Sequence, residues 1–512
     1  MEIWEMTALA LGQQIRAGKI SSEEAVKACL ERAKRVETDV HAFVHLDGER
    51  AIQAAREADR GIREGRYDSP LAGVPVAVKD NLCTEGMPTT CCSRILEQFV
   101  PPYTAEAVKR LTDAGAVILG KTNMDEFAMG STTETSCFGP TKNPWDVSRA
   151  PGGSSGGSCA AVAAGECAAA LGSDTGGSIR QPASWCGVTG IKPTYGAVSR
   201  YGLIAYGSSL DQVGPIGRDT ADCAALLGLL VGRDPKDATS AVPGAHQSMD
   251  SFLKYAPTSS ETGEADGEVA ARGLRVGIPE AFLGEGTEPG VQAAIREAAE
   301  RLKAMGATVE PCSLGLEEYV IPAYYIIASA EASSNLERFD GVKYGFRADQ
   351  EESDLHGMYK RSRSQGFGPE VKRRILLGTF VLSAGYYDAY YLKALKVRAL
   401  VRQAFDRVFE RYDVLLAPAA PSTAVPLGES LADPLKMYLG DIDTVAVNLA
   451  GLPGLSLPWG LDGQGLPVGL QLMGNRFRED LVFRAAFACE AARGPWKEVW
   501  KREGGISDGK TV

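Results

Sequence analysis

Two runs of glycine and serine, separated by a stretch of small residues, constrain the fold of this chain most strongly. The runs cover residues 152–158 and 172–178, and small residues fill most of the stretch 159–170 between them. Glycine permits positive φ angles and lets the backbone approach a ligand closely. A Gly-Gly-Ser that opens a helix also leaves unpaired N–H groups directed at one point. The runs therefore predict a site for a phosphate group or for the oxyanion of an acyl transfer.

Other interpretations of these runs fit the sequence less well. Neither run is followed by the Gly-Lys-Ser or Gly-Lys-Thr of a phosphate-binding P-loop. The dinucleotide fingerprint G-x-G-x-x-G is absent from both. A flexible linker would not enclose an alanine-rich, helix-forming segment, nor continue into the sequence Ile179-Arg180-Gln181-Pro182.

The composition excludes several classes of protein. With 44% hydrophobic and 23% charged residues, the 512-residue chain has an ordinary globular composition. Its net charge of −11 disfavours autonomous nucleic-acid binding, so we expect any RNA contact to be made through a partner. Eleven cysteines without a C-x-x-C pair indicate buried free thiols in a reducing compartment. No signal-like segment opens the chain and no apolar run could span a bilayer, so we expect a cytoplasmic protein.

The hydrophobic pattern predicts alternating helices and strands. Ser21 and Glu24 fit a capping box before an apolar stripe of helical spacing. The later predicted helices are 49–63, 105–114 and 291–305, and the predicted strands are 74–78, 116–119, 274–278, 413–417, 455–457 and 467–472. This alternation predicts an α/β fold with a largely parallel or mixed sheet.

No boundary divides the chain convincingly, so we expect one domain over residues 1–512 with helices at its N-terminal end. Residues 259–273 are rich in Glu, Gly, Ser and Ala and are predicted to form an exposed flexible loop. Residues 504–512 are predicted to form a mobile tail.

Lys79 is the candidate base. It closes the apolar, strand-like segment 73–78, so burial is plausible for it, and burial favours the neutral amine that can accept a proton. The four histidines (His41, His45, His246 and His356) lie far from the glycine runs in sequence, although distant segments can assemble a catalytic site. The competing interpretation is a solvated lysine at a strand end.

Three segments, 73–80, 152–158 and 172–183, closely resemble the amidase signature family. The last is long and specific. The resemblance implies a mixed β-sheet covered by helices on both faces, carrying a Ser–Ser–Lys triad. It implies that Ser178 is the nucleophile, that Ser154, held by a cis peptide, relays the proton, and that Lys79 is the base. It further implies an oxyanion hole made by N–H groups of Thr175, Gly176, Gly177 and Ser178.

Further segments, 121–131, 366–375, 385–391 and 447–454, resemble the glutaminase branch of that family, which serves tRNA-dependent amidotransferases. There the resemblance implies that Arg374 holds the α-carboxylate of glutamine, that Asp441 faces its α-ammonium group, and that Tyr325 lines the pocket. A free amino acid is a zwitterion, so the pocket that binds it needs one cation and one anion at a fixed separation. The alternatives are a solvated or partner-facing basic helix face for Arg374 and a helix cap for Asp441. Two departures are a longer 259–273 segment and Gly440, where the family commonly has Asn.

The resemblance implies that the chain hydrolyses glutamine and passes ammonia to a partner that converts Glu-tRNA(Gln), or Asp-tRNA(Asn), to Gln-tRNA(Gln) or Asn-tRNA(Asn). It implies a heterotrimer with the amidotransferase subunits B and C, ATP and Mg²⁺ in the partner, and no metal or organic cofactor in this chain. One alternative is a stand-alone amidase acting on another small or aryl amide. Another is a non-catalytic subunit that binds an anion or nucleotide on its glycine runs.

Overall fold

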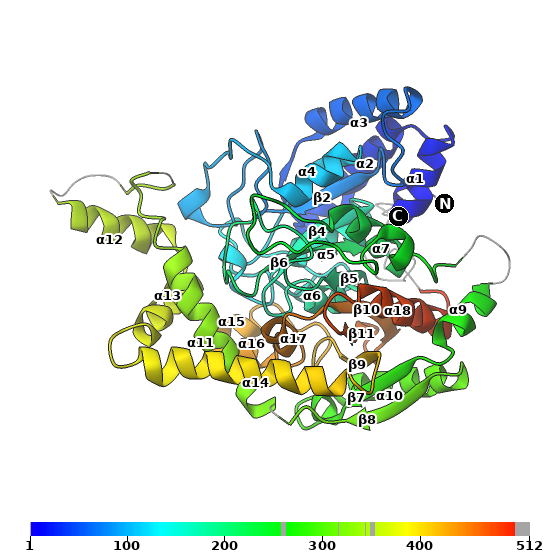
Figure 1. Cartoon of the computed structure of the whole chain (residues 1–512). Coiled ribbons are helices and arrows are strands. Elements are labelled where there is room, and N and C mark those ends of the chain that lie inside the picture. Colours follow the sequence, from blue (N-terminus) through cyan, green and yellow to red (C-terminus); the bar gives the residue numbers. More distant parts are fainter. Residues whose placement is uncertain (1, 258–262, 316, 344, 349–353, 497–512) are drawn as a thin grey trace.

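One mixed sheet organises the molecule (Figure 1). The computed structural model describes residues 2–257, 263–315, 317–343, 345–348 and 354–496. The strands of these residues are β1 Phe43–Leu46, β2 Pro75–Lys79, β3 Val117–Thr122, β4 Ala169–Asp174, β5 Thr189–Lys192, β6 Gln212–Gly217, β7 Arg275–Pro279, β8 Thr308–Cys312, β9 Val414–Pro418, β10 Gly454–Leu461 and β11 Pro467–Gly474. Their order across the sheet is β1-β3-β2-β4-β6-β5-β10-β11-β9-β7-β8.

Strand β2 pairs in parallel with both β3 and β4, and β7 pairs in parallel with β8 and β9. The other neighbouring pairs run antiparallel. The predicted α/β fold with a mixed sheet is therefore confirmed. Because β2 and β4 are parallel neighbours, their carboxyl ends, at Lys79 and Asp174, lie at the same edge of the sheet.

Helices cover the sheet. The α-helices are α1 Ala8–Arg16, α2 Ser22–Val40, α3 Gly48–Arg63, α4 Glu106–Asp113, α5 Gly156–Ala164, α6 Arg180–Cys186, α7 Thr220–Leu230, α8 Met249–Phe252, α9 Gly263–Ala271, α10 Pro289–Ala304, α11 Glu317–Asn335, α12 Leu355–Gly366, α13 Pro369–Val381, α14 Lys393–Val408, α15 Glu429–Ala432, α16 Pro434–Leu439, α17 Val445–Ala450 and α18 Glu479–Arg493. Short helical turns are η1 Ile3–Glu5, η2 Arg94–Leu96, η3 Glu126–Ala128, η4 Glu280–Leu283 and the π-helix η5 Tyr387–Leu392. None of the described helices is long and apolar enough to cross a membrane.

The alternation of side chains along the strands explains why both faces carry helices. On β2, Val76 and Val78 pack with α1, α4 and α7, whereas Ala77 packs with α2, α3 and α5 on the opposite face. On β9, Val414 packs with α10 and α18, whereas Leu415 packs with α11 and α14. Successive strand residues point to opposite faces, so each strand contributes to two hydrophobic cores.

The predicted helices and strands are present with shifts of a few residues at their ends, and β10 extends further than predicted. The capping box before α2 is also present. The Ser21 hydroxyl accepts from the Glu24 N–H at 3.1 Å, and the Glu24 carboxylate accepts from the Ser21 N–H at 2.8 Å.

The loop predicted over residues 259–273 is wrong for residues 263–271, which form helix α9. A Cβ atom built on Gly267 would lie 2.1 Å from Cβ of Ala491 in α18, and Ala270 and Ala271 are buried. The small residues therefore allow close packing of two helices rather than a mobile segment. Residues 259–262 and the predicted tail 504–512 lie outside the described residues.

Candidate active site

A buried lysine meets two adjacent serines at the carboxyl end of β2. The amine of Lys79 lies 2.8 Å from the hydroxyl oxygens of both Ser154 and Ser155, and 3.2 Å from the carbonyl oxygen of Ser173. The Gly153–Ser154 peptide is cis, as the family resemblance implies. Sequence reasoning assigned no role to Ser155. Ser154 and Ser155 both fit the nucleophile pattern G-x-S-x-G, in which a histidine imidazole is the usual base. Here the group beside both serines is the Lys79 amine and not an imidazole.

Burial sets the protonation state of Lys79. The side chain has no exposed surface, and this burial lowers the pKa of Lys79 to about 7, although the carboxylates of Asp125 and Asp174 act in the opposite direction. Near neutral pH, a large fraction of the amine is therefore neutral and can accept a proton. The expected burial of Lys79 is confirmed.

Ser178 lies in the second glycine run, between β4 and α6. Its carbonyl oxygen accepts from the N–H of Ser155 at 3.0 Å, which joins the two glycine runs. Ser178 is 8% exposed, whereas Lys79 and Ser154 are fully buried. Of these three residues, Ser178 is therefore the one that a molecule from outside can reach.

The backbone N–H groups of Thr175, Gly176 and Ser178 have no acceptor among the described residues. Gly177 differs from the expectation, because its N–H already donates to Oδ1 of Asp174 at 2.8 Å. Of the four N–H groups predicted to bind the oxyanion, three therefore remain without an acceptor. Free N–H groups gathered in one loop suit a developing negative charge.

Asp174 holds the shape of this loop. Its carboxylate also accepts from the N–H of Ile179 at 3.1 Å, from the Arg180 guanidinium at 3.0 Å and from Nδ2 of Asn448 at 2.9 Å. Burial acts to raise the pKa of Asp174, but Arg180 beside it holds that pKa well below its usual range. A permanently ionised Asp174 therefore fixes the turn that carries Ser178.

Two side chains explain why this turn requires glycine. A Cβ atom on Gly176 would lie 2.3 Å from Oη of Tyr324, and one on Gly177 would lie 2.3 Å from Oγ1 of Thr444. Gly177 also has a φ angle of +133°, which side chains rarely permit. The Thr444 hydroxyl donates to the carbonyl oxygen of Gly176 at 2.6 Å.

Asp125, to which sequence reasoning gave no role, organises the first glycine run. Its carboxylate accepts from backbone N–H groups of the loop that follows, including Thr133 at 2.8 Å and Thr132 at 3.2 Å. A Cβ atom on Gly153 would lie 2.2 Å from Oδ2 of Asp125, so the cis peptide packs directly against this carboxylate. Its only signal in the sequence is its place in the family-like segment 121–131.

Arg374, Tyr325 and Asp441 converge beside the glycine loop. The carboxylate of Asp441 accepts from the Tyr325 hydroxyl at 2.7 Å and from the Ser131 hydroxyl at 2.8 Å. The Arg374 guanidinium lies 5.1 Å from the centre of the Tyr325 ring. Thr444 connects this group to the catalytic loop, because its hydroxyl also lies 3.1 Å from the Asp441 carbonyl oxygen.

Arg374 is 3% exposed, so the alternative of a solvated basic face does not apply to it. It forms an ion pair with Glu370 at 2.8 Å and donates to the hydroxyl of Tyr206. Burial raises the pKa of Asp441 to about 6. The cluster therefore holds the Arg374 cation, the Glu370 carboxylate paired with it, and the Asp441 carboxylate, which is ionised at neutral pH.

A cavity of about 460 Å³ borders this site. It is lined on one side by Ser131 and Gln181, and Gln181 also accepts from the N–H of Gly153 at 3.0 Å. Gly440 and Asp443 line it next to Asp441. The lining of this cavity contains neighbours of the site residues, but it contains no residue of the triad and none of Arg374, Tyr325 and Asp441.

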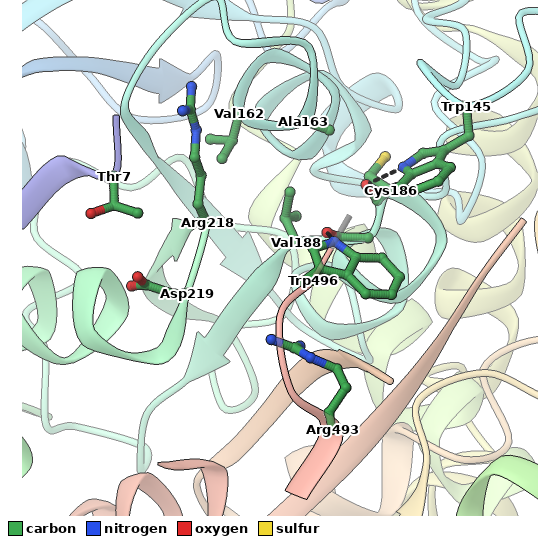
Figure 2. Close-up of a pocket in the computed structure, with 11 residues that line it drawn as sticks. Thr7, Trp145, Val162, Ala163, Cys186, Val188, Arg218, Asp219, Arg493 and Trp496 are labelled. Atoms are coloured by element: carbon green, nitrogen blue, oxygen red, sulfur yellow. Dashed lines mark hydrogen bonds between the residues drawn. The ribbon is translucent and has the colours of Figure 1, made fainter. Parts of the chain in front are cut away.

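A smaller cavity of about 190 Å³ is lined in part by Val162 and Ala163 of α5 and by Cys186 at the end of α6 (Figure 2). Trp145 and Trp496 stand at one side of it and donate to the carbonyl oxygens of Cys186 and Gly187 at 2.8 and 3.0 Å. None of its lining residues belongs to the triad or to the Arg374 cluster. This cavity is therefore distinct from the catalytic cluster.

Comparison with known proteins agrees with this geometry. The glutamyl-tRNA(Gln) amidotransferase subunits A of Agathobacter rectalis and Lachnospira eligens are 60% and 59% identical to this chain. Each alignment covers 96% of this chain, with 95% and 99% of the respective relative. The crystal structure of the Thermotoga maritima subunit of the same name is 42% identical, with a TM-score of 0.76 and coverage of 96% and 95%.

A peptide amidase from Stenotrophomonas maltophilia is also similar, with 30% identity, a TM-score of 0.77 and coverage of 96% of this chain and 97% of that one. The family model described as Amidase matches residues 24–483. These matches span nearly the whole chain and include every residue of the proposed triad. The chain belongs to the amidase family.

Proposed function

We propose that this chain hydrolyses glutamine for a tRNA-dependent amidotransferase. It is the glutaminase subunit, and its ammonia serves a partner that converts Glu-tRNA(Gln), or Asp-tRNA(Asn), to the amidated product. The observation that carries the proposal is the buried Lys79–Ser154 hydrogen bond beside Ser178, next to a pocket with paired charges. The names of its relatives support the same conclusion.

The proposed chemistry begins with proton transfer. Neutral Lys79 accepts a proton from Ser154, which takes one from Ser178, and the Ser178 oxygen attacks the side-chain amide carbon of glutamine. The carbonyl oxygen becomes an oxyanion near the free N–H groups of Thr175, Gly176 and Ser178. The proton held by Lys79 then passes back through Ser154 to the departing nitrogen. Ammonia leaves, and a glutamyl ester remains on Ser178. Water then hydrolyses the ester, activated by the same relay.

The pocket selects a free amino acid. A guanidinium fork on Arg374 suits the α-carboxylate, and ionised Asp441 suits the α-ammonium group. The ring of Tyr325 lies beside Arg374, and its hydroxyl fixes the carboxylate of Asp441. In this proposal Tyr325 sets the distance between the two charges that the substrate must match.

The hydrolysis needs only the chain's own side chains and water, so we propose no metal or organic cofactor for it. ATP and Mg²⁺ are assigned to the tRNA-binding partner, and a small third protein completes the heterotrimer. The eleven cysteines are free in the structure, and most are buried, which supports a reducing cytoplasmic location.

A stand-alone amidase is the second candidate, and the likeness to a peptide amidase favours it. An amidase for simple amides would not need the buried pair of Arg374 and Asp441. A nucleotide-binding subunit fits less well. Residues 115–122 match G-x-x-x-x-G-K-[ST], but they run into strand β3 and not a loop, and Lys121 lies 3.3 Å from the carboxylate of Asp80.

The test is ammonia release from L-glutamine, by the chain alone and with co-expressed partners. Ser178→Ala should abolish it and leave the fold intact. Ser158→Ala is the matched control, because the Ser158 hydroxyl contacts Thr122 and the Leu171 carbonyl oxygen instead of Lys79. Release from many amides but not from glutamine would favour the stand-alone amidase. Normal activity of Ser178→Ala would refute the mechanism.

A further inference from the structure

The hairpin made by α13, η5 and α14 projects from the body of the molecule at the left of Figure 1. Every residue from 383 to 390, at its tip, is exposed. The hairpin has an inner side as well, because a Cβ atom on Gly378 would lie 2.0 Å from the Ser329 carbonyl oxygen of α11. One side of α13 is thus packed tightly against the molecule, and the other side is bare.

The bare side carries a cluster of large apolar side chains, which we call the hairpin patch. Its members are Leu376, Leu377, Phe380, Tyr386, Tyr387 and Tyr390, each between 41% and 70% exposed. The rings of Phe380 and Tyr386 lie 4.3 Å apart, and those of Tyr386 and Tyr390 lie 5.8 Å apart. Soluble proteins rarely expose contiguous apolar clusters of this kind unless another surface covers them.

The hairpin patch has a basic border in an acidic protein. Residues 369–408, which span the hairpin, contain eight lysines and arginines and three acidic residues, whereas the whole chain has a net charge of −11. Of these residues, Arg374 and Glu370 are buried, and Asp388 is exposed at the tip. Lys393 and Lys396 follow the tyrosines directly and are exposed. Neither has an ion-pair partner among the residues that the structure describes.

We infer that the hairpin patch is the docking surface for a second protein subunit of the amidotransferase, which presents an apolar face bordered by carboxylates. The inference rests on the proposed function, because it requires a complex. Tyrosine and phenylalanine side chains, like those of the hairpin patch, are enriched in the buried centre of protein interfaces. The basic border supplies charge complementarity to an acidic partner.

The other occupants match this surface less well. A second copy of the chain would bring the same basic border against its own, which costs free energy through repulsion. The phosphates of an RNA would pair with Lys393 and Lys396. They would make no apolar contact with Leu376, Leu377 and Phe380.

The same hairpin reaches the substrate pocket. Helix α13 carries Arg374 on its buried side and Leu376, Leu377 and Phe380 on its exposed side. It also packs against α11, which carries Tyr325. A partner that seats on the hairpin patch would therefore hold the helix that positions the carboxylate-binding guanidinium.

The test measures how tightly the co-expressed pair of partner subunits binds the full chain, by sedimentation or by titration of the partners against the immobilised chain. The charge variant is Lys393→Glu with Lys396→Glu, and the apolar variant is Phe380→Ser with Tyr390→Ser. Matched controls are Lys19→Glu and Val242→Ser, which alter exposed residues outside the hairpin. We expect both hairpin variants to weaken binding by at least about tenfold, and the charge variant to lose most of the salt dependence of binding.

Partner binding at wild-type strength by the charge variant would overturn the inference, even if the apolar variant failed to fold. Self-association of the wild-type chain that the variants abolish would assign the surface to a second copy instead. Binding of unacylated tRNA to the isolated chain, lost in the charge variant, would assign it to RNA. Ser178→Ala should bind partners normally, so a failed glutaminase assignment and a failed docking assignment would be told apart.

Discussion

The low pKa of Lys79 makes a quantitative prediction about the pH dependence of catalysis. With a pKa of about 7 instead of 10.5, about half of the amine is neutral at pH 7, against about one molecule in 3,000 for an ordinary lysine. Because the neutral amine is the base, kcat/KM for glutamine should rise about tenfold per pH unit between about pH 6 and 7 and level off above pH 7. Below about pH 6 the slope should be steeper, because the Asp441 carboxyl gains its proton there as well. Ammonia release measured from about pH 5.5 to about pH 9 checks this profile.

The same pKa shift predicts a change in stability. Between about pH 7 and 10.5 the unfolded chain holds a proton on Lys79 that the folded chain has lost, so the free energy of unfolding rises with pH. The rise is about 1.4 kcal/mol per pH unit, about 5 kcal/mol in all, and Lys79→Met should lack it. Below about pH 7 both states carry the proton, and the difference between wild type and Lys79→Met should become constant.

Urea unfolding of wild type and Lys79→Met at about pH 7, 8 and 9 measures that difference, because contributions of other groups cancel in the comparison. Lys79→Met should also lose glutamine hydrolysis at every pH. If the two proteins changed stability in parallel with pH, or if the rate profile were centred above about pH 9, the neutral-lysine argument would be wrong.

Three further substitutions test the pocket and the catalytic loop. Asp441→Asn should raise KM for glutamine by about 10- to 100-fold in steady-state kinetics, because it removes the anion that faces the ammonium group. In wild type the same KM should rise as the pH falls below about 6, where the Asp441 carboxyl gains its proton; a flat profile would exclude this role. Gly176→Ala should cost about 1–3 kcal/mol of stability in thermal melts and lower kcat, since its Cβ would strike Oη of Tyr324. Thr444→Val should lower kcat more than it changes KM, because it frees the Gly176 carbonyl; an equal change in KM would assign Thr444 to substrate binding instead.

Some features of the site and the fold could be predicted from sequence because neighbouring residues along the chain determine them. The apolar run before Lys79 predicts a buried strand end, and the structure buries the amine completely. The capping box at Ser21 is encoded within four residues. The meeting of Arg374 with Asp441 came from family resemblance alone, since they are far apart in the chain and on different elements.

Other features depend on tertiary packing and left little trace in the sequence. Strand β4 consists mostly of small residues with weak strand propensity, and its place between β2 and β6 makes it a strand. Helix α9 could not be predicted from its composition, because Gly267, which lets the helix approach α18, is a residue type that is also common in loops. The engagement of Gly177 N–H by Asp174 depends on the exact path of a turn, which no local pattern specifies.

The separation of two groups of residues along the chain has a consequence for how such enzymes diverge. Lys79, Ser154 and Ser178 all come from the first part of the sequence, on or next to the parallel strands β2 and β4. Arg374 comes from helix α13 and Asp441 from the turn between α16 and α17, both in the last third of the chain and outside that strand pair. Mutation can therefore reshape recognition of the substrate while the bond-breaking apparatus is inherited intact. A lineage with this architecture can acquire new amide substrates without passing through an inactive ancestor.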